Sequence, residues 1–229
     1  LSSLVAAVGG SLLLASGASA ASITVTTTAD SGSEACTLRD AILSANADAG
    51  PVGACAGGGG ADAITITPTG QIQLASPLPQ ISSSMSITGP GATSLEVTRS
   101  APEDFRVFEI ASPGADVTLS GMKVSNGRVS SSGPGATSKG GGIFNAGDLT
   151  LQGVTVTSNT ASATGTLLVG SDGGGIFSDE TGSLTLERST ISDNSATGET
   201  GSADSFPGYA IGGAIESLGP LSIDQSTIS

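Results

Sequence analysis

The charge and composition of the chain exclude two classes of partner. Its 229 residues carry a formal net charge of -13, with only seven Lys and Arg residues and no His. Nucleic-acid binding and attachment to anionic membranes both depend on Lys and Arg, so we expect neither.

An apolar segment opens the chain. Residues 4–15 have the length of a signal-peptide core, and Ala18, Ser19 and Ala20 form a cleavage site of the A-x-A type. We therefore expect residues 1–20 to be the later part of a secretory leader that begins upstream. The segment is too short to span a bilayer, and we expect no transmembrane segment in this chain.

Residues 21–60 are expected to form an N-terminal cap that contains both cysteines, Cys36 and Cys55. An even cysteine count behind an export signal predicts a structural disulfide. A metal pair or a reactive thiol is the alternative, and it lacks a His partner or ligand. We expect no cofactor, no metal ligand and no catalytic residue in the chain.

One short helix is predicted directly after Cys36. Thr37 followed by Asp40 resembles a capping box, with Asp in the place of Glu. The apolar residues that follow at helical spacing are Leu38, Ala41, Ile42 and Ala45. This face is expected to cover the open end of a β-sheet stack.

From residue 61 onward the pattern changes to short β-branched runs separated by Gly, Pro and Ser. Such runs predict strands of four or five residues with turns between them. The first four predicted strands are residues 64–67, 71–74, 84–88 and 94–98.

A repeat is visible in the second half of the chain. The tetrad Gly-Gly-Ile-Phe at 141–144 recurs at 174–177 and, altered to Gly-Gly-Ala-Ile, at 212–215. In the strands that follow, apolar residues two apart share one face while Thr or Ser occupies the other. The matched apolar sets are Leu149, Leu184 and Leu221; Leu151, Leu186 and Ile223; and Val156, Ile191 and Ile228, with Val117, Leu119, Met122 and Val124 in the same register upstream.

These repeats predict an all-β fold, a right-handed parallel β-helix with a short N-terminal capping helix. Three strands per repeat, in constant order and with short connections, stack into parallel sheets around one core. Residues 61–229 are expected to be its coils, with more coils beyond residue 229. The Ser/Thr/Gly/Ala segments 162–172 and 197–210 are interpreted as corner insertions, and the Ser/Gly-rich segment ending at Gly140 is not expected to be a returning strand. An antiparallel sandwich is the structural alternative.

The N-terminal segment also carries a family resemblance. Residues 36–42, Cys-Thr-Leu-Arg-Asp-Ala-Ile, resemble the Cys-Ser-Leu-Arg-Glu-Ala motif of the CSLREA-domain proteins, and residues 87–92 and 140–145 resemble the β-helix coils that usually follow it. The resemblance implies an exported bacterial β-helix of the pectin-lyase-like fold, in a family mostly without assigned activity. It transfers no functional residue.

The aligned repeats place charged residues on one outer column. Gln152, Glu187 and Asp224 occupy matched positions, with Arg188 beside them. Stacked positions lie about 4.8 Å apart, so two neighbouring carboxylates there could raise one pKa, bind a cation or act as acid and base. A solvated corner explains the same residues equally well.

Three other patterns have both a functional and a structural interpretation. Residues 57–65 match a Ca²⁺-binding nonapeptide in a single copy, or a loop before the first strand. Asn159 and Asn194 are interpreted as a turn ladder. The outer columns Thr150, Thr185 and Ser222, and Thr155, Thr190 and Thr227, could contact sugars or ice, or serve simply as exposed strand residues.

The sequence therefore predicts a monomeric, secreted or cell-surface scaffold for display, adhesion or contact with a polysaccharide or host-surface ligand. No catalytic constellation is evident, because Ser–His–Asp and Cys–His mechanisms need a His. The alternative is a polysaccharide lyase or glycoside hydrolase whose site lies in further coils.

Overall fold

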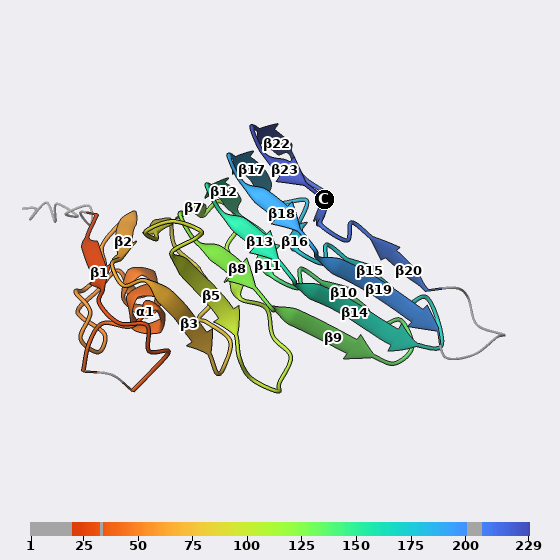
Figure 1. The fold of residues 1–229 in the computed structure, drawn as a ribbon, viewed down its shortest axis with the longest axis horizontal. Helices are drawn as coiled ribbons and strands as arrows, with labels where there is room; N and C mark the ends of the chain where they lie inside the picture. The colour runs from red at the N-terminus through yellow and green to blue at the C-terminus, as the bar shows by residue number, and fades with distance from the viewer. Residues whose placement is uncertain (1–19, 33, 201–207) are drawn as a thin grey trace, which may run out of the picture.

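The computed structural model describes residues 20–32, 34–200 and 208–229 (Figure 1). This described part is all-β except for one helix, and its strands form five sheets, named A to E here. Every strand pairing in it is parallel.

Sheets A, B and C make up the body of the molecule. Sheet A consists, in spatial order, of β1 (Ser22–Val25), β2 (Asp62–Ile66), β4 (Met85–Thr88), β7 (Asp116–Ser120), β12 (Asp148–Gln152), β17 (Ser183–Glu187) and β22 (Leu221–Asp224). Sheet B consists of β3 (Gly70–Leu74), β5 (Leu95–Arg99), β8 (Lys123–Ser125), β13 (Thr155–Thr157), β18 (Thr190–Ser192) and β23 (Thr227–Ile228). Sheet C consists of β6 (Phe108–Ile110), β11 (Ile143–Asn145), β16 (Ile176–Ser178) and β21 (Ile215–Ser217).

Sheets D and E form a two-layered projection that we call the flange. Sheet D consists of β9 (Arg128–Ser132), β14 (Thr160–Gly165) and β19 (Ser195–Thr200), and sheet E of β10 (Thr137–Lys139), β15 (Gly170–Asp172) and β20 (Tyr209–Ile211). In Figure 1 the flange extends from the body on the C-terminal side of the molecule.

The chain visits the five sheets in a fixed order. From β6 onward successive strands belong to sheets C, A, B, D and E, and the cycle then begins again. Each strand pairs with the equivalent strand of the next cycle, so the repeats stack in register. The order explains why all the pairings are parallel, since strands of one sheet are separated by a full cycle.

The helix α1 (Leu38–Ala47) packs against β1 and β2 at the N-terminal end of the body. Thr37 is its N-cap, and the Thr37 side chain accepts a hydrogen bond from the Asp40 N–H. The predicted apolar face is buried in the common core. Cys36 and Cys55 form the predicted disulfide, which ties the start of the helix to the segment before β2.

The core of the body consists of apolar columns that run across the sheets. Leu151 of sheet A pairs with Leu119 and Leu186, and Val156 of sheet B pairs with Ile191. All of these side chains are completely buried. The predicted register of these repeats is therefore confirmed, as are the first four predicted strands to within two residues at either end.

The prediction of three strands per repeat is wrong. The segments interpreted as corner insertions contain strands of the flange, so the later repeats have five strands. The segment that ends at Gly140 contains β9 and β10, which belong to different sheets and pair in parallel with the next repeat, so it holds no returning antiparallel strand. These segments are rich in Ser, Thr, Gly and Ala, and they lack the alternation of large apolar residues that marks the body strands. Residues 201–207 of the 197–210 segment lie outside the described residues, as does the leader up to residue 19.

The predicted alignment of the third copy of the tetrad is wrong by one residue. Ile176 pairs with Ile215, so Gly212 matches Gly173, and Glu216 takes the outward position that Phe177 occupies one repeat earlier. The shift places Glu216 on the column of Phe144 and Phe177, which has Glu109 at its other end.

Among the described residues, no helix has both the length and the hydropathy needed to cross a membrane.

Candidate functional site

The outer face of sheet A carries a continuous rank of small polar side chains. The rank takes one residue from each of the seven strands and has a hydroxyl at every position except Ala63: Ser22, Ala63, Ser86, Thr118, Thr150, Thr185 and Ser222. We call this set the hydroxyl rank. The structure stacks the predicted Thr150, Thr185 and Ser222 and extends the column to the N-terminal end.

The outer face of sheet B has a comparable column with a charged segment. Lys123 pairs with Thr155, and Thr155, Thr190 and Thr227 continue in register as predicted. Beside them Glu96 and Lys123 line an open groove of about 530 Å³. The column therefore changes from a charged groove to a row of threonines.

The charges in that groove are paired with each other. Glu96 accepts hydrogen bonds from Ser125 Oγ at 2.6 Å and Gln71 Nε2 at 2.7 Å, and Lys123 Nζ lies 2.9 Å from Glu96 Oε1. Burial opposes ionisation of Glu96, but the bonds from Ser125, Lys123 and Gln71 together outweigh it and lower the pKa of this carboxyl. Glu96 is thus held as a carboxylate that fixes Lys123.

The predicted charged column is also assembled on sheet A. Glu187 pairs with Gln152 and with Asp224 in neighbouring strands. Gln152 Nε2 donates to Glu187 Oε2 at 3.0 Å, and Arg188 Nη2 lies 3.6 Å from the same oxygen. The Glu187 carboxylate thus already has two partners, and both it and Arg188 are open to solvent.

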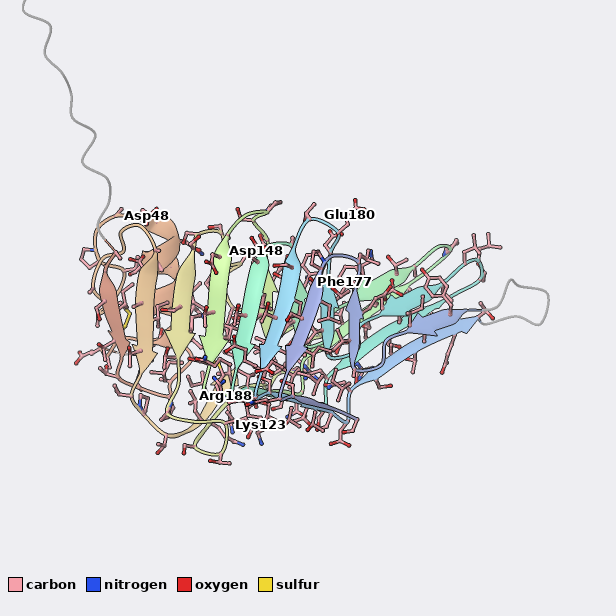
Figure 2. All side chains as sticks on the ribbon, turned by 90° about the horizontal axis from the view of Figure 1, so that it is seen from above. Asp48, Lys123, Asp148, Phe177, Glu180 and Arg188 are labelled. Carbon is pink, nitrogen blue, oxygen red and sulfur yellow. A yellow bond between two sulfur atoms is a disulfide. The ribbon has the colours of Figure 1, made fainter. Side chains whose placement is uncertain are left out.

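A second cluster, which the sequence did not predict, lies where sheet E of the flange meets sheet C. Phe144 and Phe177 stack on the outer face of sheet C with ring centroids 5.6 Å apart. Lys139 Nζ of sheet E lies 4.4 Å from the Phe177 ring centroid, and the Arg106 guanidinium lies 5.0 Å from the Phe144 centroid. We call this corner the trough, and Figure 2 shows Phe177 where the flange leaves the body.

Charged groups line both ends of the trough. Toward the N-terminal end Arg106 Nη1 pairs with Glu109 Oε2 at 2.6 Å, and Gln80 Nε2 donates to Glu109 Oε1 at 2.6 Å. Toward the C-terminal end Asp172 of β15 faces Glu216 of β21. These two carboxyls come from different sheets, Asp172 from sheet E and Glu216 from sheet C.

The Asp172 and Glu216 carboxyls lie close enough to influence the pKa of each other. A hydrogen bond between two carboxyls requires one of them to carry a proton. Burial raises the pKa of Asp172, although Lys139 opposes the rise. Burial and the charge of Asp172 both raise the pKa of Glu216. The two carboxyls therefore keep their protons to a higher pH than isolated carboxyls do.

The single copy of the Ca²⁺-binding pattern has a structural role. Asp62 is buried, and its Oδ1 accepts hydrogen bonds from the Ala21 N–H at 2.8 Å and the Gly59 N–H at 2.9 Å. Its carboxylate thus joins the start of β1 to the glycine loop. Within the described ranges no group of three or more His, Cys, Asp or Glu side chains could hold a metal ion.

The two asparagines stack as a ladder, as predicted. Asn159 Nδ2 donates to Asn194 Oδ1 at 3.0 Å, and Asn159 Oδ1 accepts from the Gly127 N–H at 2.8 Å. Asn194 Nδ2 in turn donates to the Val156 carbonyl at 2.9 Å. These amides satisfy backbone groups at the turn between sheets B and D, which is a structural role.

The trough could have been found from the sequence by a different alignment. Matching Gly173-Gly174-Gly175 with Gly212-Gly213-Ala214 places Glu216 opposite Phe177. A glutamate that replaces a phenylalanine in a repeat is a visible signal. Its partner Asp172 could not be found in this way, because the strand that positions Asp172 was not predicted.

Comparison of the chain with family models, with curated proteins and with solved structures finds no match. The functional assignment therefore depends on these residues and their geometry.

Proposed function

We propose that the chain forms a right-handed parallel β-helix of the pectin-lyase-like type, exported by a bacterium and displayed at the cell surface. The fixed cycle of strands and the in-register stacking of repeats support this fold. Crossovers between parallel strands are right-handed in almost all proteins. The disulfide and the predicted leader support an exported location.

We propose further that it acts as a scaffold that contacts glycans through its outer faces. The observation that carries this proposal is the hydroxyl rank, which crosses seven strands at intervals of about 4.8 Å and has a hydroxyl on every strand except at Ala63. Hydroxyl groups both donate and accept hydrogen bonds, so a regular row of them suits the hydroxyls of an extended polysaccharide. The sheet B threonines provide a second such row.

The test is binding of the purified chain to immobilised neutral and acidic polysaccharides, with release of soluble sugar measured in parallel. The double variant T150V/T185V keeps strand-forming side chains of similar size and removes two adjacent hydroxyls. We expect binding without cleavage, weakened about tenfold by this variant. The control T137V/T164V makes the same change at exposed positions of the flange and should bind like the unaltered chain.

The outcomes separate this proposal from its rival. Cleavage of a polysaccharide would favour the lyase or hydrolase, for which the adjacent Glu187 and Asp224 are the supporting observation. Equal binding by T150V/T185V and the unaltered chain would remove the hydroxyl rank from the contact surface.

A further inference from the structure

The strongest unassigned feature is the carboxyl pair in the trough. Asp172 is 5% exposed, and the atoms Asp172 Oδ1 and Glu216 Oε2 are buried. Neither of these two oxygens receives a hydrogen bond from an N–H or O–H group in the described part of the chain. An unpaired buried carboxylate is strongly unfavourable, so these atoms need a proton or a cation between them.

The charges around the pair decide between a proton and a cation. Lys139 of β10 faces both carboxyls and lies over Phe177, and Tyr209 of β20 is the remaining titratable group that faces them. One ammonium and two carboxyls are electrically balanced when the carboxyls share a single proton. A divalent cation would instead leave an uncompensated positive charge in a buried corner, which desolvation opposes.

Tyr209 does not disturb this balance at moderate pH. Burial and the charges of Asp172 and Glu216 raise the pKa of its phenol. The phenol therefore stays neutral over the range in which the carboxyls titrate. Lys139 acts in the opposite direction to burial on both carboxyls and favours their ionised forms.

We propose that Asp172 and Glu216 form a proton-dependent clasp that fastens the flange to the body. The clasp is closed when the two carboxyls share one proton, with Glu216 donating to Asp172. It opens when that proton passes to solvent, because two adjacent carboxylates then repel each other across the corner between β15 and β21. This inference does not depend on glycan binding.

The direction of the pH effect follows from the raised pKa values. Isolated Asp and Glu carboxyls titrate near about 3.9 and 4.3, and both members of the pair titrate higher in the folded chain. Their contribution to stability is complete below the unfolded values and is lost as the pH rises through the folded ones. The corner should therefore be tightest in acid and loosest in alkaline solution.

The test compares thermal unfolding of the chain and of Glu216→Gln between pH 5 and pH 8. The glutamine keeps a hydrogen-bond donor toward Asp172 but cannot release it as a proton. The high negative charge makes the whole chain less stable as the pH rises. The difference between the two proteins in the pH dependence of Tm therefore reports on the clasp alone. We expect Tm of the unaltered chain to fall by about 3 °C more than Tm of the variant.

Glu180→Gln provides the matched control. Glu180 is an exposed glutamate between β16 and β17, and Figure 2 shows it at the margin of the body. This control should keep the pH dependence of the unaltered chain. Equal pH dependence of Glu216→Gln and the unaltered chain would overturn the proposal.

A second measurement needs no variant. Carboxyl ¹³C chemical shifts of the unaltered chain should show Asp172 and Glu216 titrating together, with the proton released above the range of exposed carboxyls. Titration of both groups within the ordinary range would overturn the clasp. So would a rise of Tm by several degrees on addition of Ca²⁺ that Glu216→Gln abolishes, since the pair would then be a cation site.

Discussion

The body and the flange are built from the same repeats but are held together by different chemistry. In the body, columns of Leu, Ile and Val are completely buried between sheets A, B and C. In the flange, sheets D and E approach closely through Ala and Gly, and hydroxyls bridge the two layers. Ser138 Oγ donates to the Ser162 carbonyl at 2.6 Å, and Ser171 Oγ donates to the Thr197 carbonyl at 2.7 Å.

This difference between body and flange shows what the stacking of parallel repeats requires. Backbone hydrogen bonds align the repeats in both regions, but only the body gains apolar burial from every added repeat. The flange gains short hydrogen bonds and close contacts, and each of these contributes less. The comparison predicts that stability lies mainly in the body and that the flange opens first when conditions worsen.

The largest expected effect comes from breaking a body column. Leu186→Ala removes a completely buried side chain between Leu151 and Ile223. It should lower the free energy of unfolding by about 2–5 kcal/mol, measured by urea denaturation. A loss below about 1 kcal/mol would mean that the column is not a packed core.

Removal of the disulfide should rank next. Cys36 and Cys55 close a loop with a sequence separation of 19 residues at the N-terminal end of the body. The double variant C36A/C55A should lose roughly 3 kcal/mol by the same measurement, because the unfolded chain regains freedom. Equal stability of the oxidised and reduced chains would contradict this role.

A single flange hydroxyl should matter less. Ser138→Ala removes the bond to the Ser162 carbonyl and the contact with Ser131 Oγ at 2.8 Å. We expect a loss of about 1 kcal/mol, together with faster amide exchange in β10 and β15. The exposed Ser132→Ala on sheet D is the control, and an equally large effect there would show that the bridging hydroxyls are not special.

The smallest effect should come from the charged outer column. Arg188 is about half exposed and lies 3.6 Å from the Glu187 carboxylate. Surface ion pairs contribute little, so Arg188→Ala should change stability by about 0.5 kcal/mol or less in thermal unfolding. A large loss would show that the column has a structural role that its exposure does not suggest.

The same contrast explains which parts of the structure could be predicted from the sequence. The alternation of Leu149 and Leu151 with polar residues reports the body strands directly, since period-two burial is a property of the strand itself. The helix was predictable because Thr37 and the spacing of Leu38, Ala41, Ile42 and Ala45 are local signals. Both kinds of signal depend on residues close together in the chain.

The flange and its clasp depend on contacts that the local sequence does not encode. Residues such as Ala161, Ala163 and Gly198 have low strand preference, and they form strands here because a neighbouring repeat lies directly against them. The position of Asp172 follows from the pairing of β15 with β20, and the position of Glu216 follows from the pairing of β16 with β21. Glu216 in place of a phenylalanine is visible in the repeat, but tertiary pairing alone brings Asp172 to it.

The register of the stacked repeats is most directly tested by a crystal structure of the chain at side-chain resolution. The account predicts that the Thr150 Cα lies about 4.8 Å from the Thr118 and Thr185 Cα atoms, in strands that run the same way. Antiparallel neighbours, or a separation of Leu151 from Leu186 that removes them from contact, would contradict it.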